Sequence, residues 1–163
     1  MRAVSAESWA STSRFCSPIR PTDGASFGGN QLLLPLFNAD AIPFWDGCGR
    51  DVLMLQCCSG CQLYRYPPSP ICNSCLSPDH QWVPASGKGT LFSFVIVHRA
   101  LDPYWQGEVP YVVAVVELAE GPHLISNLVG IDFDQIQIGM ALGVVFEALS
   151  DEIKVPRFRV YPT

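Results

Sequence analysis

The second half of the chain consists of short runs of aliphatic, β-branched and aromatic residues, separated by turns rich in Gly, Pro and polar side chains. Runs of this kind are typical of β-strands. No long helical pattern interrupts them, so they suit a small closed barrel, for which the OB-fold is the common five-stranded form. A sandwich is the structural alternative. The predicted strands are 90–98, 111–118, 123–129, 141–149 and 158–161.

Two pairs of cysteines interrupt the pattern in the segment 51–86. Residues 51–56 predict a strand leading into the first pair, and residues 63–66 predict the return strand of a hairpin. Residues 81–84 predict a further extended segment after the second pair. A module of about 35 residues is too small to be held by a hydrophobic core alone, so a bound metal is expected to supply its folding energy.

A short helix is predicted before this module. Asn38 and Asp40 offer capping side chains, and Phe44 and Trp45 give the helix an apolar anchor. The residues before it show no sustained period, and we expect an unstructured tail. The predicted fold is therefore mainly β. Its parts are a tail at 1–37, a helix at 38–50, a zinc ribbon at 51–86 and an OB-fold at 87–163.

The cysteine spacing predicts a metal site. Cys58 and Cys61 form one C-x2-C pair, Cys72 and Cys75 form another, and ten residues separate the pairs. This spacing is typical of tetrahedral zinc. Four thiolates fill the coordination shell of zinc, which leaves no open position for water or substrate. We therefore predict one structural Zn²⁺ per chain.

The alternatives are disulfides or free thiols. Seven cysteines make an odd count, and the N-terminus lacks the apolar core of a secretory signal, so an oxidising compartment has no support. Cys57 could replace Cys58 in an x3 pairing with Cys61, although the x2 spacing is favoured. Cys16, Cys48 and Cys57 are then ordinary thiols. A thioredoxin-like use of C-x2-C would need a βαβ pattern, which this region lacks.

Composition narrows the classes of function. The chain is 48% hydrophobic and 15% charged, as expected for a folded protein, and no apolar stretch reaches the length of a membrane helix. We expect a soluble, cytoplasmic protein with no membrane association. The net charge is −5 with only two lysines, so the basic surface expected of a nucleic-acid binder is missing.

No catalytic constellation emerges from the polar residues. The histidines fall at predicted strand ends or in a loop, the serine lacks the G-x-S-x-G context of a nucleophile, and two nearby aspartates suit a solvated loop. A closed zinc site cannot activate water either. We therefore do not expect a stand-alone enzyme. The residues considered are His80, His98, His123, Ser126, Asp132 and Asp134.

The order of features over residues 38–161 resembles the acyl-CoA-associated family that joins a rubredoxin-like zinc ribbon to an OB-fold. One departure is that Gln62 and Leu76 follow the second cysteine of each pair, where metal knuckles often carry Gly. The features are the Phe44-Trp45 helix, the two C-x2-C pairs with Pro67-Pro68 between them, Gly87-x-Gly89, 110–114, Glu117-Leu118, 120–122, 126–129, 138–140, 151–153 and 156–158.

The resemblance implies an accessory role in acyl-CoA and lipid metabolism. Family members are small non-catalytic partners of thiolase-like enzymes, namely aldolases of steroid side-chain degradation, an archaeal thiolase–synthase pair and a phloroglucinol acyltransferase. Similar modules are fused to, or paired with, hot-dog-fold hydratases. It therefore implies a hetero-oligomer with a thiolase-superfamily enzyme or such a hydratase, and contact with coenzyme A or acyl-CoA through that partner.

Two sets of residues are candidates for these contacts. Arginine offers forked donors to phosphate, so three arginines could contact coenzyme A, although ordinary surface positions explain them equally well. Aromatic residues anchor interfaces, although Tyr104 and Trp105 could instead close the barrel mouth. The candidates are Arg99, Arg157 and Arg159 for the cofactor, and Phe44, Trp45, Tyr104 and Trp105 for the partner.

Two other functions remain as alternatives. A nucleic-acid-binding module would use the second and third strands of the OB-fold, but residues 87–163 hold nine acidic and five basic residues, and Tyr111 is the only aromatic on those strands. A free-standing carrier of acyl-CoA or lipid would need a ligand-sized pocket within the chain.

Overall fold

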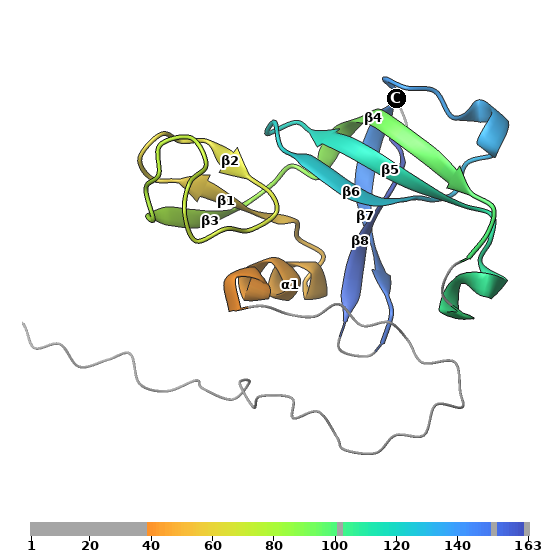
Figure 1. Cartoon of the computed structure of the whole chain (residues 1–163), viewed down its shortest axis with the longest axis horizontal. Helices are drawn as coiled ribbons and strands as arrows, with labels where there is room; N and C mark the ends of the chain where they lie inside the picture. Colours follow the sequence, from red (N-terminus) through yellow and green to blue (C-terminus); the bar gives the residue numbers. More distant parts are fainter. Residues whose placement is uncertain (1–38, 101–102, 151–152, 162–163) are drawn as a thin grey trace, which may run out of the picture.

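In the computed structural model, residues 39–100, 103–150 and 153–161 are described. A three-stranded ribbon and a closed five-stranded barrel lie side by side, and a short helix lies beneath them (Figure 1). The predicted tail at 1–37 falls outside the described residues. Within the described part of the chain, no helix is long and apolar enough to cross a membrane.

The helix α1 spans Ile42–Gly49 and follows the short 3-10 helix η1, Ala39–Ala41. The predicted capping by Asp40 is wrong, because Ala41 occupies the N-cap and no side chain caps the helix; Asn38 lies outside the described residues. Pro43 sits in the first turn, where its missing N–H costs nothing. The helix packs against β1 (Met54–Cys58) and β8 (Lys154–Val160).

The ribbon has the strand order β2-β1-β3, with both pairs antiparallel. Its outer strands are β2 (Tyr64–Arg65) and β3 (His80–Pro84). Strand β1 begins three residues later than predicted. The chain first leaves α1 through Asp51, whose φ is 61°, and Val52 donates its N–H to Gly47 at 2.9 Å. These residues close the helix, so ladder pairing can start only at Met54.

The barrel contains β4 (Lys88–Val97), β5 (Tyr111–Leu118), β6 (His123–Leu128), β7 (Ala141–Ala148) and β8. Its closed order is β4-β5-β6-β8-β7, and β6 and β8 are its one parallel pair among the described strands. This arrangement confirms the OB-fold and excludes the sandwich. The short 3-10 helices η2 (Pro103–Gly107) and η3 (Phe133–Gln135) lie in the connections.

Strand β8 starts four residues earlier than predicted. It pairs with β7 from Ala148↔Lys154 through Leu142↔Val160. The sequence pattern does not predict the first half of this strand, because it contains Pro156 and Arg157 and neither residue type is typical of a strand interior. The Pro156 carbonyl accepts a hydrogen bond from the Ser126 hydroxyl at 2.6 Å.

The barrel core is formed by inward-facing residues that alternate along each strand. On β5, Val112, Ala114, Val116 and Leu118 are buried, whereas the residues between them face outward. Some of the outward positions on three neighbouring strands are also apolar, although Ser93, Asn127 and His123 lie among them. We call this surface the outer sheet face; its members are Phe92, Val95, Val113, Val115 and Ile125.

Two glycines of α1 test how the helix packs. A Cβ on Gly47 would lie 2.7 Å from the Val52 carbonyl oxygen and would also meet the Met54 side chain, whereas nothing lies within 4 Å of a Cβ on Gly49. Gly47→Ala should therefore lower the free energy of unfolding by about 1–3 kcal/mol. Gly49→Ala should leave it unchanged or raise it by up to about 1 kcal/mol. Urea unfolding measures both, and equal effects would contradict this packing.

Candidate metal centre

Each C-x2-C pair forms a tight backbone turn of the same geometry. In the first, Gln62 donates its N–H to the Cys58 carbonyl at 2.9 Å, and Cys58 donates to Leu63 at 3.0 Å. In the second, the N–H of Leu76 reaches the Cys72 carbonyl at 3.0 Å, and Cys72 donates to Ser77 at 2.9 Å. Two equivalent knuckles thus present two sulfurs each.

The two knuckles contain left-handed residues other than glycine. Gln62 has φ 62° and Leu76 has φ 60°. These are the positions at which the sequence departs from the usual Gly. A side chain in this region costs roughly 1–2 kcal/mol. The knuckle geometry is therefore kept at some strain.

The four sulfurs converge on one point. The ligand atoms of Cys58, Cys61, Cys72 and Cys75 lie within 4.8 Å of one another, with 3.5 Å between Cys58 and Cys75 and 3.7 Å between Cys61 and Cys72. Tetrahedral zinc with bonds of about 2.3 Å would place sulfurs about 3.8 Å apart. The donor set and its spacing therefore fit zinc. In the described part of the chain this is the one such group of three or more possible ligands.

Cys57 lies apart from the cluster. Alternation along β1 turns it to the face opposite Cys58, and its sulfur is directed at the Gln62 carbonyl, 3.7 Å away. Cys48 is buried in the core, and this burial raises the pKa of its thiol to about 12. All six cysteines among the described residues are free thiols. Cys16 falls outside those residues.

Backbone N–H groups act on the thiols of Cys58, Cys61 and Cys72. The N–H groups of Cys75 and Ser74 donate to the Cys72 sulfur and lower its pKa to about 6. The N–H of Cys61 lowers the pKa of Cys58 in the same way. The N–H of Leu63 acts in this direction on Cys61, but desolvation and the neighbouring sulfurs leave its pKa raised to about 12. Two sulfurs are thus favoured as thiolates, and a bound cation would favour all four.

A chain of polar contacts that starts at the buried Gln56 supports the knuckles from β1. The amide of Gln56 contacts His80 Nε2 at 3.2 Å, and its oxygen accepts the N–H of Ser69 at 3.0 Å. His80 Nδ1 in turn lies 3.1 Å from the Pro78 carbonyl. These contacts fix the loop between the knuckles. Sequence reasoning missed Gln56, although a polar residue at the end of an apolar strand was the available signal.

The predicted interface aromatics differ in exposure. The prediction that Phe44 contacts a partner is wrong. Its side chain is 2% exposed and belongs to the core, and its ring packs edge-on against that of Trp45, with 5.1 Å between the ring centroids. It therefore cannot anchor a partner. Trp45 is half-buried, as is Trp105, whose ring lies 4.8 Å from that of Tyr111. The side chain of Tyr104 is outside the described part of the chain.

The candidate arginines are not equivalent. Arg157 Nε lies 2.8 Å from a Glu147 carboxylate oxygen, close enough for an ion pair although the N–H is not aimed for a hydrogen bond. Arg159 and Arg99 are exposed. His98 and His123 are exposed too, and the His123 ring stands edge-on to Phe92. Among the described residues, neither His98 nor His123 belongs to a cluster of possible metal ligands.

Two family models match consecutive parts of the chain. Residues 45–81 match the ChsH2 rubredoxin-like zinc ribbon domain, and residues 82–147 match the ChsH2 C-terminal OB-fold domain. In solved structures, a chain of the Ltp2-ChsH2(DUF35) aldolase superposes with a TM-score of 0.72 at 37% identity. That match covers 78% of this chain and 98% of the other.

Curated relatives carry two kinds of name. A DUF35 domain-containing scaffold protein of Methanothermobacter thermautotrophicus is 33% identical over 96 residues, which are 58% of this chain and 71% of that protein. A probable enoyl-CoA hydratase alpha subunit of Thermomonospora curvata is 38% identical over 125 residues, 77% of this chain but 39% of that subunit. The chain spans well under half the length of that hydratase subunit. Taken with the four-cysteine ribbon and the closed barrel, these matches show that the chain belongs to the ChsH2 (DUF35) family.

Proposed function

We propose that this chain is a non-catalytic accessory subunit of a thiolase-like enzyme that acts on an acyl-CoA. The observation that carries the proposal is the match over 98% of the DUF35 chain in an aldolase built from two proteins. The scaffold name of the archaeal relative agrees with it. The hydratase name of the other relative favours a hot-dog-fold hydratase as the second candidate partner. Free thiols in the described residues are compatible with the reducing cytoplasm.

We further propose that Cys58, Cys61, Cys72 and Cys75 bind one zinc ion. A site of four thiolates is closed, so the ion would stabilise the ribbon and take no part in chemistry. The ribbon has few buried apolar residues of its own, and Cys58 and Cys72 are among them. The metal would therefore supply much of its folding energy.

The outer sheet face is the docking surface that we propose for the thiolase-like subunit. Contiguous apolar patches on soluble proteins mark interaction sites. Phe92, Val95 and Ile125 are each more than half exposed, and Val113 and Val115 lie between them. Trp45, Tyr104 and Trp105 remain candidates for contact with the partner, without Phe44. Arg99 and Arg159 remain candidates for contact with coenzyme A held by the partner.

Nucleic acid is the weaker alternative for this face. Base stacking needs aromatic rings in a basic groove. The outer positions of β5 and β6 carry Val113, Val115 and Ile125 beside Tyr111, Asn127 and His123, and the one charged residue in these rows is the acidic Glu117 rather than a Lys or Arg. An apolar protein surface matches this chemistry better.

Replacement of one ligand tests the zinc assignment. Purified under reducing conditions, the chain should contain about one zinc, and Cys72→Ser should lose it because three thiolates leave the shell incomplete. Elemental analysis measures the metal, and hydrogen exchange should show lost protection in β1–β3 with the barrel retained. Cys57→Ser is the matched control and should keep its zinc. Full zinc content in Cys72→Ser would refute the assignment.

The strained knuckle gives a second test. Leu76 is 75% exposed, so replacing it removes little packing. Leu76→Gly should bind zinc about twofold more tightly, since relief of left-handed strain is partly offset by the flexibility of glycine when unfolded. Leu76→Val should bind roughly fivefold more weakly, because a branched side chain fits this conformation worst. Chelator competition ranks the three proteins, and tighter binding by the Val variant would contradict the strain argument.

Two isoleucines of equal exposure test the docking surface. Ile125 is 67% exposed on the outer sheet face, and Ile138 is 68% exposed in the loop before β7. The chain should co-elute with its thiolase-like subunit in size-exclusion chromatography. Ile125→Glu should weaken that complex at least about tenfold by placing a charge in an apolar interface, whereas Ile138→Glu should not. Separate elution of two folded wild-type proteins would refute the accessory role; equal behaviour of the variants would refute only this surface.

A further inference from the structure

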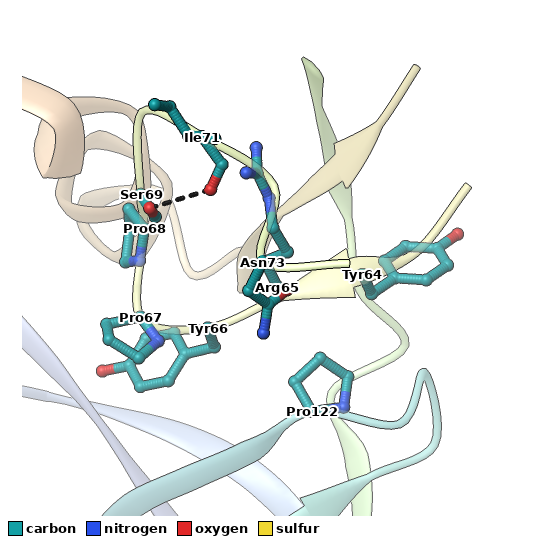
Figure 2. A pocket seen from close by; sticks show the side chains of 9 residues that line it. All are labelled: Tyr64, Arg65, Tyr66, Pro67, Pro68, Ser69, Ile71, Asn73 and Pro122. Atoms are coloured by element: carbon teal, nitrogen blue, oxygen red, sulfur yellow. Dashed lines mark hydrogen bonds between the residues drawn. The ribbon is translucent and has the colours of Figure 1, made fainter. Parts of the chain in front are cut away.

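The ribbon leaves a sheet edge open on its β3 side. The barrel is closed, so among the described strands only β2 and β3 lie at an edge (Figure 1). Strand β2 has two residues, and these line a pocket together with Pro122 of the hairpin between β5 and β6 (Figure 2). Strand β3 has five residues, none of them buried, and β1 is the one described helix or strand that packs extensively against it. The β3 edge is therefore the one long enough to receive another strand.

The ladder between β1 and β3 shows which backbone groups point to that edge. The bonds that flank the ladder involve odd-numbered residues at both ends. The N–H of Ala85 reaches the Leu53 carbonyl at 2.7 Å, and the Asp79 carbonyl accepts the Ser59 N–H at 3.0 Å. In an antiparallel pair, residues that bond across the ladder alternate with residues that do not. The odd-numbered residues of β3 therefore bond to β1, and the even-numbered residues direct their backbone groups away from it.

The outward row consists of two donors and three acceptors. The donors are the N–H groups of His80 and Trp82, and the acceptors are the carbonyls of His80, Trp82 and Pro84. Proline has no N–H, so position 84 offers an acceptor alone. Within the described part of the chain, no backbone group bonds to this row. The row is therefore ready to pair with an extended chain.

The β3 edge also lacks the usual protection. Proteins guard edge strands with charged side chains, bulges or proline, because an unguarded edge pairs with other chains. Strand β3 contains no Asp, Glu, Lys or Arg, and its pairing with β1 has no bulge. Its one proline is the last residue, where it leaves both outward N–H groups in place. The sequence of β3 thus keeps the edge competent for pairing.

We propose that this edge binds the same edge of a second copy of the chain, antiparallel about a two-fold axis at Trp82. The two ribbons would then form one six-stranded sheet. Trp82 of each copy would exchange both backbone hydrogen bonds with Trp82 of the other. The N–H of His80 would reach the carbonyl of Pro84 in the second copy. Every outward N–H would thus find an acceptor, and only the His80 carbonyl would be left to water.

The edge complements itself in its side chains as well. The two Trp82 side chains would lie opposite each other on one face, where aromatic cross-strand pairs are favourable. No like charges would meet along the paired strands, although the whole chain carries a net charge of −5. A pair of five-residue strands buries much less than the roughly 1,200 Å² of a stable interface, so the dimer would be weak. The outer sheet face takes no part in this pairing, which does not depend on the proposed function.

A lysine substitution on β3 tests the pairing. Sedimentation of the zinc-loaded full chain should show dimers that increase from micromolar to near-millimolar concentration. Gln81 is exposed, and in the dimer it would lie opposite Val83 of the second copy. Gln81→Lys should weaken the dimer at least tenfold, because the two introduced charges would be diagonal neighbours roughly 7–8 Å apart. Gln137→Lys, in the exposed loop before β7, should change it less than twofold. Both variants should keep their zinc.

Hydrogen exchange of single amides tests the register in the wild-type chain. The outward N–H groups of His80 and Trp82 should exchange at least fivefold more slowly in the dimer, whereas those of Gln81 and Val83, already bonded to β1, should be protected at every concentration. A chain that stays monomeric throughout would overturn the proposal.

Three other results would also overturn it. Slow exchange of the His80 and Trp82 amides at every concentration would assign the edge to another segment of the same chain. Slow exchange only after the thiolase-like subunit is added would assign the edge to a strand of that subunit. A dimer that persists in Gln81→Lys, with no change at these amides, would lie on another surface.

Discussion

The convergence of four cysteine sulfurs is the constraint on which the ribbon depends. Strand β2 has only two residues, and the loop between the knuckles is held chiefly by Gln56 and by backbone turns. Such a segment has too little apolar surface to order itself. Once the sulfurs meet, β1 and β3 are paired through Cys58↔His80, and the loop is closed at both ends. This closure positions the two knuckles and the loop between them relative to β1 and β3.

The helix α1 connects the ribbon to the barrel. Phe44 lies in the core with its ring 5.4 Å from that of Tyr66, while α1 also packs on β8. An ion pair of 2.7 Å between Lys154 and Asp51 lies near the same junction, but both groups are partly exposed, so it adds little. The two units are therefore held together by apolar packing on one helix. Phe44, which the sequence predicts at a partner interface, is used in this packing inside the chain instead.

The parts of the structure that follow local rules could be predicted from the sequence. The C-x2-C spacing determines the knuckles, and strand β5 was predicted with its observed bounds because its apolar run is uninterrupted. The wrong predictions occur where contacts between residues that are distant in the sequence determine the local structure. Asp40 has the chemistry of a cap, but the chain already turns as a 3-10 helix there. Pro156 disguises the start of β8, and no local pattern separates a buried Phe44 from an exposed one.

The burial of Arg65 is another feature that the sequence alone could not predict. An arginine between two tyrosines in a short strand is ordinary in sequence, and only the folded chain shows that its charge is enclosed. The ribbon would be at least as stable with an apolar residue of similar size at this position. The outer sheet face carries apolar residues in contact with water, and Arg65 is a charged residue out of contact with it. Each reverses the usual partition of apolar side chains to the core and charged side chains to the surface.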